Sequence, residues 1–523
     1  MSDSWRISVN DIDQSQTINS SPGNTGAMVI RSSKGPLKPI YVNAAKEKTI
    51  VDIYGEPSVT YPDVWEAIQY NKTAPMWISA PYSSDALLGG VIVSAAGTVA
   101  FNDSEGTIPA SIADFTFADS TEYFILTSIS PYADDLGVKI SYDDVSLLFT
   151  ILLYRTADSG TTWTLIDSYK VSMTSGTLDG FGQNVYVEEI FDQDPLTSNY
   201  LQAQVNATGA FTSFVDDVAT VALSGGSRGT TTTIIEWKVA WAYFQNKRIY
   251  EADIFMDPTA DGDIPAEFDT LRSTYQTYSQ YLLPLPQEAA ATAVSTKAGY
   301  SIDERGLAFY WNRARVKDTY NNSSFWTTLI GRIGGKHAQM KDVYNGLAPS
   351  WIDENGHGGQ LGSGILELKY DPSESELETF DDNGINPIVF DFAYGVMIVS
   401  QKTGKSPTVL SDSSWIAHSR MFDFIVSTVK EQVLVYQITK LNDDAHRQLA
   451  YSKTDQIMSP ISALNLVSEY GIQCDRGNND DVALAARKFV LTLAVKVTPF
   501  SETIVFNFVQ VGQTQEVSNY ISS

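Results

Sequence analysis

The sequence contains little cysteine and little histidine. Cysteine occurs once, at position 474, and histidine occurs four times in 523 residues. A single cysteine excludes an internal disulfide and a metal site built from several thiolates. Four histidines are few for a metalloenzyme of this length, so we expect no metal and no other cofactor.

Long apolar runs and basic residues are also scarce. No apolar run approaches the ~20 residues that span a bilayer, and residues 1–5 show no basic segment followed by an apolar stretch. We therefore expect synthesis in a cytoplasm and no membrane insertion. The formal net charge of −27 would repel phosphate backbones, so we expect no direct nucleic-acid binding.

The length of the chain predicts two to four domains. Residues 25–90 and 230–345 alternate short apolar strands, such as 27–30 and 76–78, with helical spacing, which indicates an α/β trunk. Residues 91–229 are rich in turns and contain a strand pattern at 149–154, which indicates a β-rich surface insertion. The expected fold class is therefore a multi-domain α+β chain with a mixed-sheet trunk.

Residues 346–502 are predicted to form a C-terminal α/β domain. Apolar positions between 415 and 433 follow one helical face, and a second helix is expected from about 443 to 470. A strand should follow, because Leu491, Leu493 and Val495 alternate with other residues.

Both ends of the chain have strand patterns next to polar segments. Trp5, Ile7 and Val9 alternate with polar residues in an arm at 1–24, and a second alternating set lies in the tail at 503–523. That second set is Ile504, Phe506 and Phe508. Such short strands are unstable alone, and the first arm could reach up to about 80 Å. They either join the sheet of another subunit or fold back on their own core.

Sequence motifs that would indicate catalysis or nucleotide binding are weak in this chain. Residues 225–229 match G-x-S-x-G around Ser227, but four threonines at 230–233 disfavour the helix that a nucleophile elbow needs immediately after the serine. A glycine turn between domains is the simpler interpretation. The basic, Gly-rich segment 331–337 lacks P-loop spacing. Positive charge is concentrated at Arg313, Arg315, Lys317, Arg332 and Lys336, which indicates either a solvated face or an acid-facing interface. We assign no catalytic residue and no metal ligand.

The order of several short motifs resembles the contractile phage tail sheath family over most of the chain. The N-terminal motifs are an apolar strand at 27–30, the turn 34–36 and Tyr-Gly-Glu-Pro at 54–57. The C-terminal motifs are Gly-Ile-Asn-Pro-Ile at 384–388, the helix containing Arg420 and the closing strands at 490–497 and 504–508.

This resemblance implies a structural protein and not an enzyme. Family members stack as hexameric rings around a tail tube and contract, which drives the tube through the host envelope for genome ejection. The implied partners are further copies of the chain, the tail tube protein, the baseplate and the tail terminator (neck) proteins. The implied location is the virion tail, after assembly in the host cytoplasm.

The resemblance also suggests roles for particular residues. The C-terminal domain would face the tube, and its sheet would be completed by strands exchanged between subunits, with Leu491, Leu493 and Val495 on the receiving strand. Basic residues on or near the two C-terminal helices are candidates for contact with an acidic tube: Lys430, Lys440, His446, Arg447 and Lys453. A cellular injection machine, a virion receptor- or carbohydrate-binding protein and a serine hydrolase at Ser227 are the alternatives.

Overall fold

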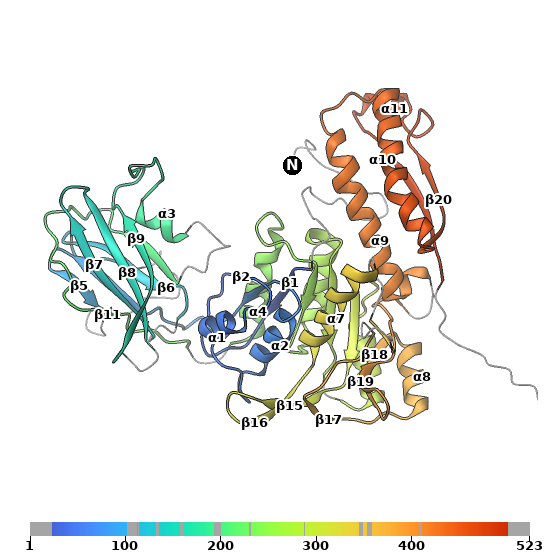
Figure 1. Ribbon diagram of the computed structural model, residues 1–523, viewed down its shortest axis with the longest axis horizontal. Coiled ribbons are helices and arrows are strands. Elements are labelled where there is room, and N and C mark those ends of the chain that lie inside the picture. The colour runs from blue at the N-terminus through green and yellow to red at the C-terminus, as the bar shows by residue number, and fades with distance from the viewer. Residues whose placement is uncertain are drawn as a thin grey trace, which may run out of the picture. The chain divides into compact units, whose positions relative to one another are not determined.

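The computed structural model describes residues 24–101, 112, 115–131, 135–156, 160–192, 200–229, 232–286, 288–344, 349–352, 358–406 and 411–499. These residues belong to two compact units, Met1–Glu431 and Gln432–Ser523 (Figure 1). Both predicted arm strands, with Trp5, Ile7 and Val9 and with Ile504, Phe506 and Phe508, lie outside the described residues.

An eight-stranded sheet forms the centre of the first unit, in the order β19-β18-β14-β13-β12-β1-β3-β2. Its strands are β1 Gly26–Val29, β2 Ile40–Val42, β3 Met76–Ser79, β12 Ile254–Met256, β13 Gln280–Pro284, β14 Leu307–Trp311, β18 Ile385–Asp391 and β19 Gly395–Ile398. The six inner strands run parallel, whereas β2 and β19 join the two edges antiparallel. The predicted mixed α/β fold is confirmed.

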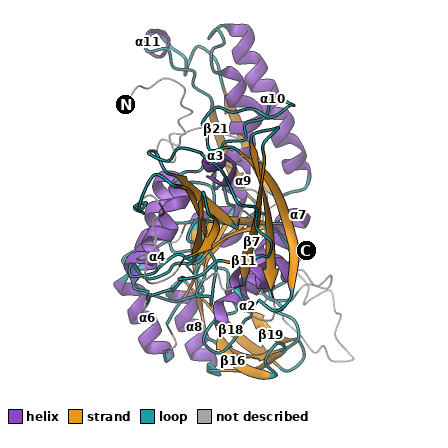
Figure 2. Cartoon of the chain, turned by 90° about the vertical axis from the view of Figure 1, so that its left-hand side faces the viewer, coloured by secondary structure: helices purple, strands orange, loops and turns teal. Residues whose placement is uncertain are grey.

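Each face of this sheet carries its own apolar core, because side chains alternate along a strand. Met28 and Ile30 lie in one core with α1 Glu47–Tyr54, α2 Pro62–Asn71 and α7 Ile330–Tyr344. Ala27 and Val29 lie in the other, with α4 Ile234–Ala242, α5 Ile264–Thr270, α6 Ala290–Gly299 and α8 Glu374–Asp382. In Figure 2, α4 and α6 lie on the left and α7 lies on the right, in keeping with their places in the two cores.

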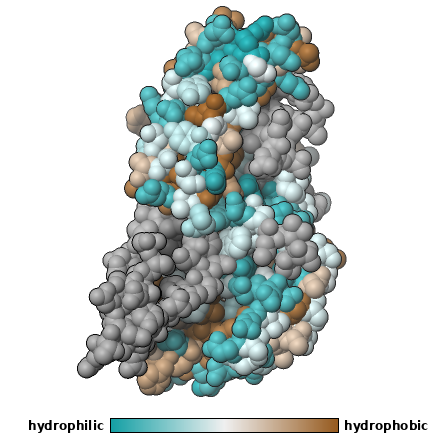
Figure 3. Space-filling view, turned by 90° about the vertical axis from the view of Figure 1, so that its right-hand side faces the viewer, coloured by the Kyte–Doolittle hydropathy of each residue, from teal (hydrophilic) through white to brown (hydrophobic). Residues whose placement is uncertain are grey.

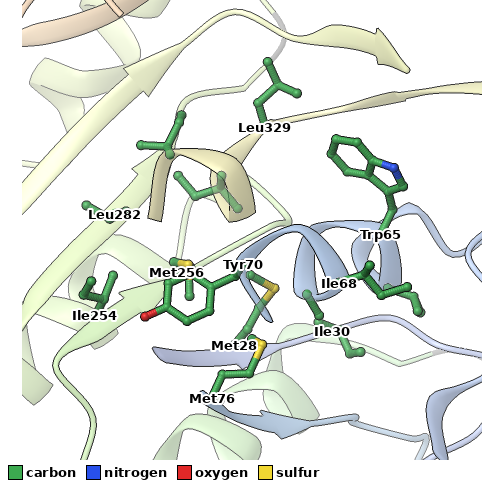
Figure 4. Close-up of a cluster of buried hydrophobic side chains, with 14 of the residues drawn as sticks. Met28, Ile30, Trp65, Ile68, Tyr70, Met76, Ile254, Met256, Leu282 and Leu329 are labelled. Atoms are coloured by element: carbon green, nitrogen blue, oxygen red, sulfur yellow. The ribbon is translucent and has the colours of Figure 1, made fainter. Parts of the chain in front are cut away.

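The first core is built largely from methionine, aromatic and branched side chains. Figure 4 shows Tyr70 of α2 among Met28, Met76 and Met256, which come from three neighbouring strands. All four side chains are fully buried. Burying side chains of this size stabilises a fold by about 1.5–3 kcal/mol each, which makes this layer a rigid support.

Residues 90–222 form two four-stranded antiparallel sheets, in the segment for which a β-rich insertion was predicted. One sheet contains β4 Gly90–Ser94, β5 Gly97–Ala100, β6 Glu122–Ser128 and β10 Leu201–Val205, and the other contains β7 Leu136–Asp143, β8 Leu148–Thr156, β9 Trp163–Val171 and β11 Val221–Ala222. Their inner faces share one core, which also includes the short helix α3 Val187–Asp192. The insertion is therefore a β-sandwich.

The boundary between the two units does not fall at residue 346, where the C-terminal domain was predicted to begin. Strands β18 and β19 extend the large sheet, and α9 Ile416–Val429 contributes Ile416 to its first core. A three-stranded sheet also belongs to this unit, with β15 Ala314–Asp318, β16 Ser323–Thr327 and β17 Ile365–Leu368. Hydrogen bonding to β14 therefore places residues 385–391 in the first unit.

The second unit contains α10 Asp444–Ala463, β20 Val467–Gln473, α11 Asp481–Ala485 and β21 Thr492–Val497. The helix predicted to run to residue 470 ends at Ala463, and the remainder of that segment is the start of a strand. Asn465, at a left-handed φ of 57°, lies between the two. None of the described helices combines the length and the apolar character needed to cross a bilayer.

Candidate strand-acceptor sheet

The second unit contains a hairpin that fits the predicted receiving sheet. Strands β20 and β21 pair antiparallel, with Ile472 opposite Leu493 and Tyr470 opposite Val495. Leu493 and Val495 thus lie on β21, and Leu491 immediately precedes it. Within the described residues this sheet has two strands, so the outer edge of each strand has no partner strand there. An isolated two-stranded sheet is marginal in water.

One face of the hairpin is apolar but incompletely covered. Leu491, Leu493 and Val495 are half-buried, whereas the alternate residues Thr492 and Ala494 are exposed. Helix α10 packs against β20, and its buried positions follow helical spacing: Arg447, Ala450, Thr454, Met458 and Ile461. An added strand at either edge would cover more of this face.

Two asparagines fix the chain that leads into β21. The buried Asn479 side chain donates to the carbonyl of Val490 at 2.7 Å and accepts from the Val490 amide at 2.8 Å. The amide group of Asn442 donates to the oxygen of Asn479 at 3.2 Å and to the carbonyl of Lys488 at 2.8 Å. These bonds hold the segment that leads into β21, and the sequence offered no signal for Asn442.

The five basic candidates for tube contact do not all lie on the surface. Lys430 is buried, with its Nζ 5.2 Å from the centre of the Tyr278 ring, and burial lowers its pKa to about 8. Arg447 is also buried, and its guanidinium donates to the carbonyl of Asn442 at 2.8 Å and pairs with Asp444. Placing these two at an exposed contact was wrong, because both have internal partners.

The other three basic candidates are accessible to different degrees. Lys440 is exposed, and His446 and Lys453 are half-buried. His446 contacts Asp443 at 2.8 Å, and Lys453 lies over the Tyr436 ring at 5.2 Å. Figure 3 shows at its top that polar and scattered apolar residues share the surface of this unit. Tube contact by these three residues stays a prediction.

Arg420, on the helix that resembles the sheath family, is an internal residue. Its Nη2 donates to the carbonyl of His337 at 2.7 Å, and the Nε2 of His337 lies 2.8 Å from the hydroxyl of Tyr310. Burial lowers the pKa of Arg420 to about 10 and the pKa of His337 well below its ordinary value. These residues connect α9, α7 and β14.

Ser227 does not lie in a nucleophile elbow. Its amide and carbonyl bond to the backbone of Leu87 at 2.8 and 2.7 Å, and the next helix begins only at Ile234. The adjacent Arg228 donates to the carbonyl of Pro81 at 2.9 Å. These contacts support a glycine turn where the chain crosses between the trunk and the insertion.

The Gly-rich segment 331–337 lies at the start of α7. The basic residues predicted to form a solvated face or an acid-facing interface are half-buried, except for the exposed Lys317. An acid-facing contact by them stays a prediction. Ile333 and His337 are fully buried, and Arg332 lies 5.0 Å from the Trp65 ring. Four hydrogen bonds hold the buried Glu66 carboxylate at this helix start, including those from the amides of Leu329 at 2.7 Å and Gly331 at 2.8 Å. The segment therefore packs α7 against α2.

Comparison with known proteins finds a shared fold and a sequence similarity. No family model matches the chain. Its fold is shared by a sheath tail protein from Listeria innocua, at a TM-score of 0.53 and 11% identity, covering 92% of this chain and 96% of that one. The contracted helical sheath of the anti-feeding prophage gives a TM-score of 0.52 at 10% identity, covering 95% and 98% of the two chains.

The sequence is similar to the tail sheath protein of Enterobacteria phage T4. The two are 21% identical over 370 residues, which is 66% of this chain and 54% of the phage protein. The chain therefore covers about half the length of that relative. Together the fold and this similarity confirm the predicted resemblance to the contractile tail sheath proteins.

Proposed function

We propose that the chain is the structural subunit of a contractile tail sheath. Copies would polymerise as stacked hexameric rings around a tail tube, and contraction would drive the tube through the host envelope for genome ejection. The sequence similarity to a phage tail sheath protein carries this proposal, and the fold shared with a contracted sheath supports it. The role is mechanical and not enzymatic, in a virion tail that assembles in the host cytoplasm.

Strand exchange is the proposed means of assembly. The arm strands containing Ile7 and Val9, and Ile504 to Phe508, would add to the open edges of the β20–β21 hairpin in neighbouring copies. Main-chain hydrogen bonds would supply affinity, and alternate side chains would supply register. Each apolar side chain buried in this way contributes about 1.5–3 kcal/mol, repeated around every ring. The half-buried Leu493 and Val495 support this proposal.

The remaining partners follow from the position of a sheath in a tail. The second unit would face the tail tube, and the ends of the polymer would meet the baseplate and the tail terminator (neck) proteins. The extended sheath would be a metastable packing and the contracted sheath a deeper minimum, between which compact units move with little internal change. The dense cores of the first unit suit such a moving body.

Deletion of residues 1–20 tests the proposal. The truncated chain should remain folded, because the described cores begin after residue 24, but it should not form ringed helical tubes in electron micrographs. A control deletion of residues 513–523 removes a shorter polar stretch from the other end of the chain and spares Phe508, so the shortened chain should still polymerise. Normal tubes from the first deletion would contradict strand exchange, and absence of tubes from the full chain would contradict the function itself.

A cellular contractile injection machine is the second candidate. The fold shared with the anti-feeding prophage sheath is the observation that favours it. Both candidates require the same subunit and the same polymer. Electron microscopy of particles isolated with the assembled sheath separates them, because only a phage tail is attached to a capsid that contains DNA.

A further inference from the structure

The sheet β16-β15-β17, called the small sheet here, has one buried face and one open face. On its central strand β15, Ala314, Val316 and Asp318 are buried, whereas Arg315 is half-buried and Lys317 is exposed. Because side chains alternate along a strand, both cations lie on the outer face. Strands β16 and β17 flank β15, so this face extends over three strands at the lower edge of the first unit in Figure 1.

The outer face gathers cations around a tryptophan. Trp326 of β16 lies directly opposite Arg315, and residues directly opposite each other share a face. The exposed Lys369, just beyond β17, places its Nζ 5.3 Å from the centre of the Trp326 ring. Since β15 lies between β16 and β17, this contact spans the width of the sheet, and the side chains form one patch. Tryptophan and arginine are among the residues that most often dominate the binding energy of protein interfaces.

The patch carries more positive than negative charge. Glu367 lies opposite Arg315 and contacts its Nε at 3.4 Å, and both side chains are almost half exposed. Lys317 and Lys369 form no ion pair with any residue that the structure describes. Nearby carboxylates that accept hydrogen bonds from other groups are Asp318 and Glu47. In a chain with a net charge of −27, a face of this kind favours an acidic partner.

Helix α8 of the same chain presents an acidic face. Glu374, Glu378 and Asp382 are exposed and follow one another at four-residue spacing, so they lie along one side of the helix. The opposite side packs against the second core through Leu377 and the buried Phe380. Within the described part of the chain, none of the three carboxylates pairs with a cation.

The two lysines beside α8 have partners of their own. Lys402 contacts Asp381 at 3.2 Å, and Lys297 donates to the carbonyl of Asn383 at 2.6 Å. Both lysines are buried. The acidic face of α8 is therefore left to a partner that brings cations.

The two surfaces lie on opposite sides of the large sheet. The buried face of the small sheet, with Val316 and Phe325, belongs to the first core, whereas Phe380 of α8 belongs to the second. Packed layers are about 10 Å apart, so a copy's own α8 does not cover its small sheet. We propose that the acidic face of α8 in one copy docks on the outer face of the small sheet in a second copy. A head-to-tail contact of this kind builds rings or helices, and the inference rests on the proposed polymer.

Paired charge reversals test this contact in the full chain. Lys317→Glu with Lys369→Glu reverses the small sheet, and Glu378→Lys with Asp382→Lys reverses α8 near its C-terminal end, where lysine suits the helix dipole. The matched control is Lys72→Glu with Arg248→Glu, two exposed cations that belong to neither surface. We expect each test pair to raise the critical concentration for polymerisation about tenfold or more, because like charges then meet. The control pair should leave it unchanged.

Combining the two test pairs in one chain separates a contact from a loss of fold. In this fourfold variant the reversed α8 again meets a small sheet of opposite charge, so the critical concentration should return toward the wild-type value. Wild-type polymerisation by both test pairs would overturn the contact, as would an equal loss from the control pair or no recovery in the fourfold variant. If the wild type itself never polymerises, the proposed function fails and this inference fails with it, which is distinct from a polymer that ignores these substitutions.

Discussion

The guanidinium of Arg272 donates from Nη2 to both carboxylate oxygens of Asp423, at 2.9 and 3.0 Å, across 151 residues of sequence. Both side chains are buried. Arg305 and Gln280 donate to the same carboxylate at 3.1 and 3.0 Å, and Glu304 lies 3.2 Å from the Nε of Arg272. This network fastens α9 to the large sheet, which is why the helix belongs to the first unit.

Loss of Asp423 should destabilise the first unit strongly. Asp423→Ala leaves Arg272 buried without its main counter-charge, and breaking a buried pair in this way costs about 3–5 kcal/mol. Glu367→Ala is the control, because the Glu367–Arg315 pair is half exposed and worth less than about 1 kcal/mol. Equilibrium unfolding in urea measures both changes, and equal losses from the two variants would contradict a special role for the network.

Close packing of α7 on α2 gives a second prediction. A Cβ added at Gly331 would lie 1.9 Å from the carbonyl oxygen of Glu66, which is backbone and cannot rotate away. Gly331→Ala should therefore cost about 1–3 kcal/mol or more of unfolding free energy. At Gly335 the nearest atom is the Thr73 hydroxyl at 3.1 Å, so Gly335→Ala should be much milder. Similar thermal unfolding midpoints for the two variants would contradict this interpretation.

The sequence was sufficient to predict strands whose own residues form an apolar run or an alternating pattern. The strands β1, β3 and β12 are short apolar runs, and β21 alternates, so burial could be inferred from pattern alone. The glycines at 331 and 334 were misleading, because glycine usually indicates a turn. Here the structure uses them for close helix contact, which depends on α2 and β12 residues remote in sequence.

The candidate strand-acceptor sheet and the basic residues near it were predictable only in part, because burial depends on residues that are remote in sequence. Alternation correctly predicted that Leu493 and Val495 lie on one strand, β21. Their role in receiving a strand from another copy stays a prediction. Charge alone could not separate the exposed Lys440 from the buried Lys430 and Arg447, because burial depends on Tyr278 and Asn442. The unit boundary after Glu431 was also hidden, since it depends on pairing of β18 with β14.

Stability should depend on pH through Asp257. Burial raises the pKa of this carboxyl from 3.8 to about 6, so the folded chain binds the proton more tightly than the unfolded chain. The resulting stabilisation is complete below about pH 4 and is lost as the pH rises through about 6, for a total of about 3 kcal/mol. Comparing the unfolding free energy of wild type and Asp257→Asn between pH 4 and pH 7 isolates this effect. The wild type should fall relative to the variant, and parallel curves would contradict it.

Contact with the tail tube should depend on the accessible lysines of the second unit. The double variant Lys440→Glu with Lys453→Glu changes one exposed and one half-buried lysine. Neither lysine is buried like Arg447, so the second unit should keep its fold. Binding to purified tail tubes, measured by co-sedimentation, should fall about tenfold or more, since like charges repel across an acidic interface. Arg447→Glu should instead lower the melting temperature, because it breaks internal bonds to Asn442.

Two controls complete the tube-binding experiment. One changes the salt concentration, and the other reverses a charge far from the second unit in the sequence. If lysines contact the tube, raising the salt concentration toward 1 M should weaken wild-type binding, because the screening length falls to about 3 Å. Lys72→Glu reverses an exposed lysine of the first unit and should leave binding unchanged. Equal binding to tail tubes by this control and the double variant, with no dependence on salt, would contradict a charge contact by these lysines.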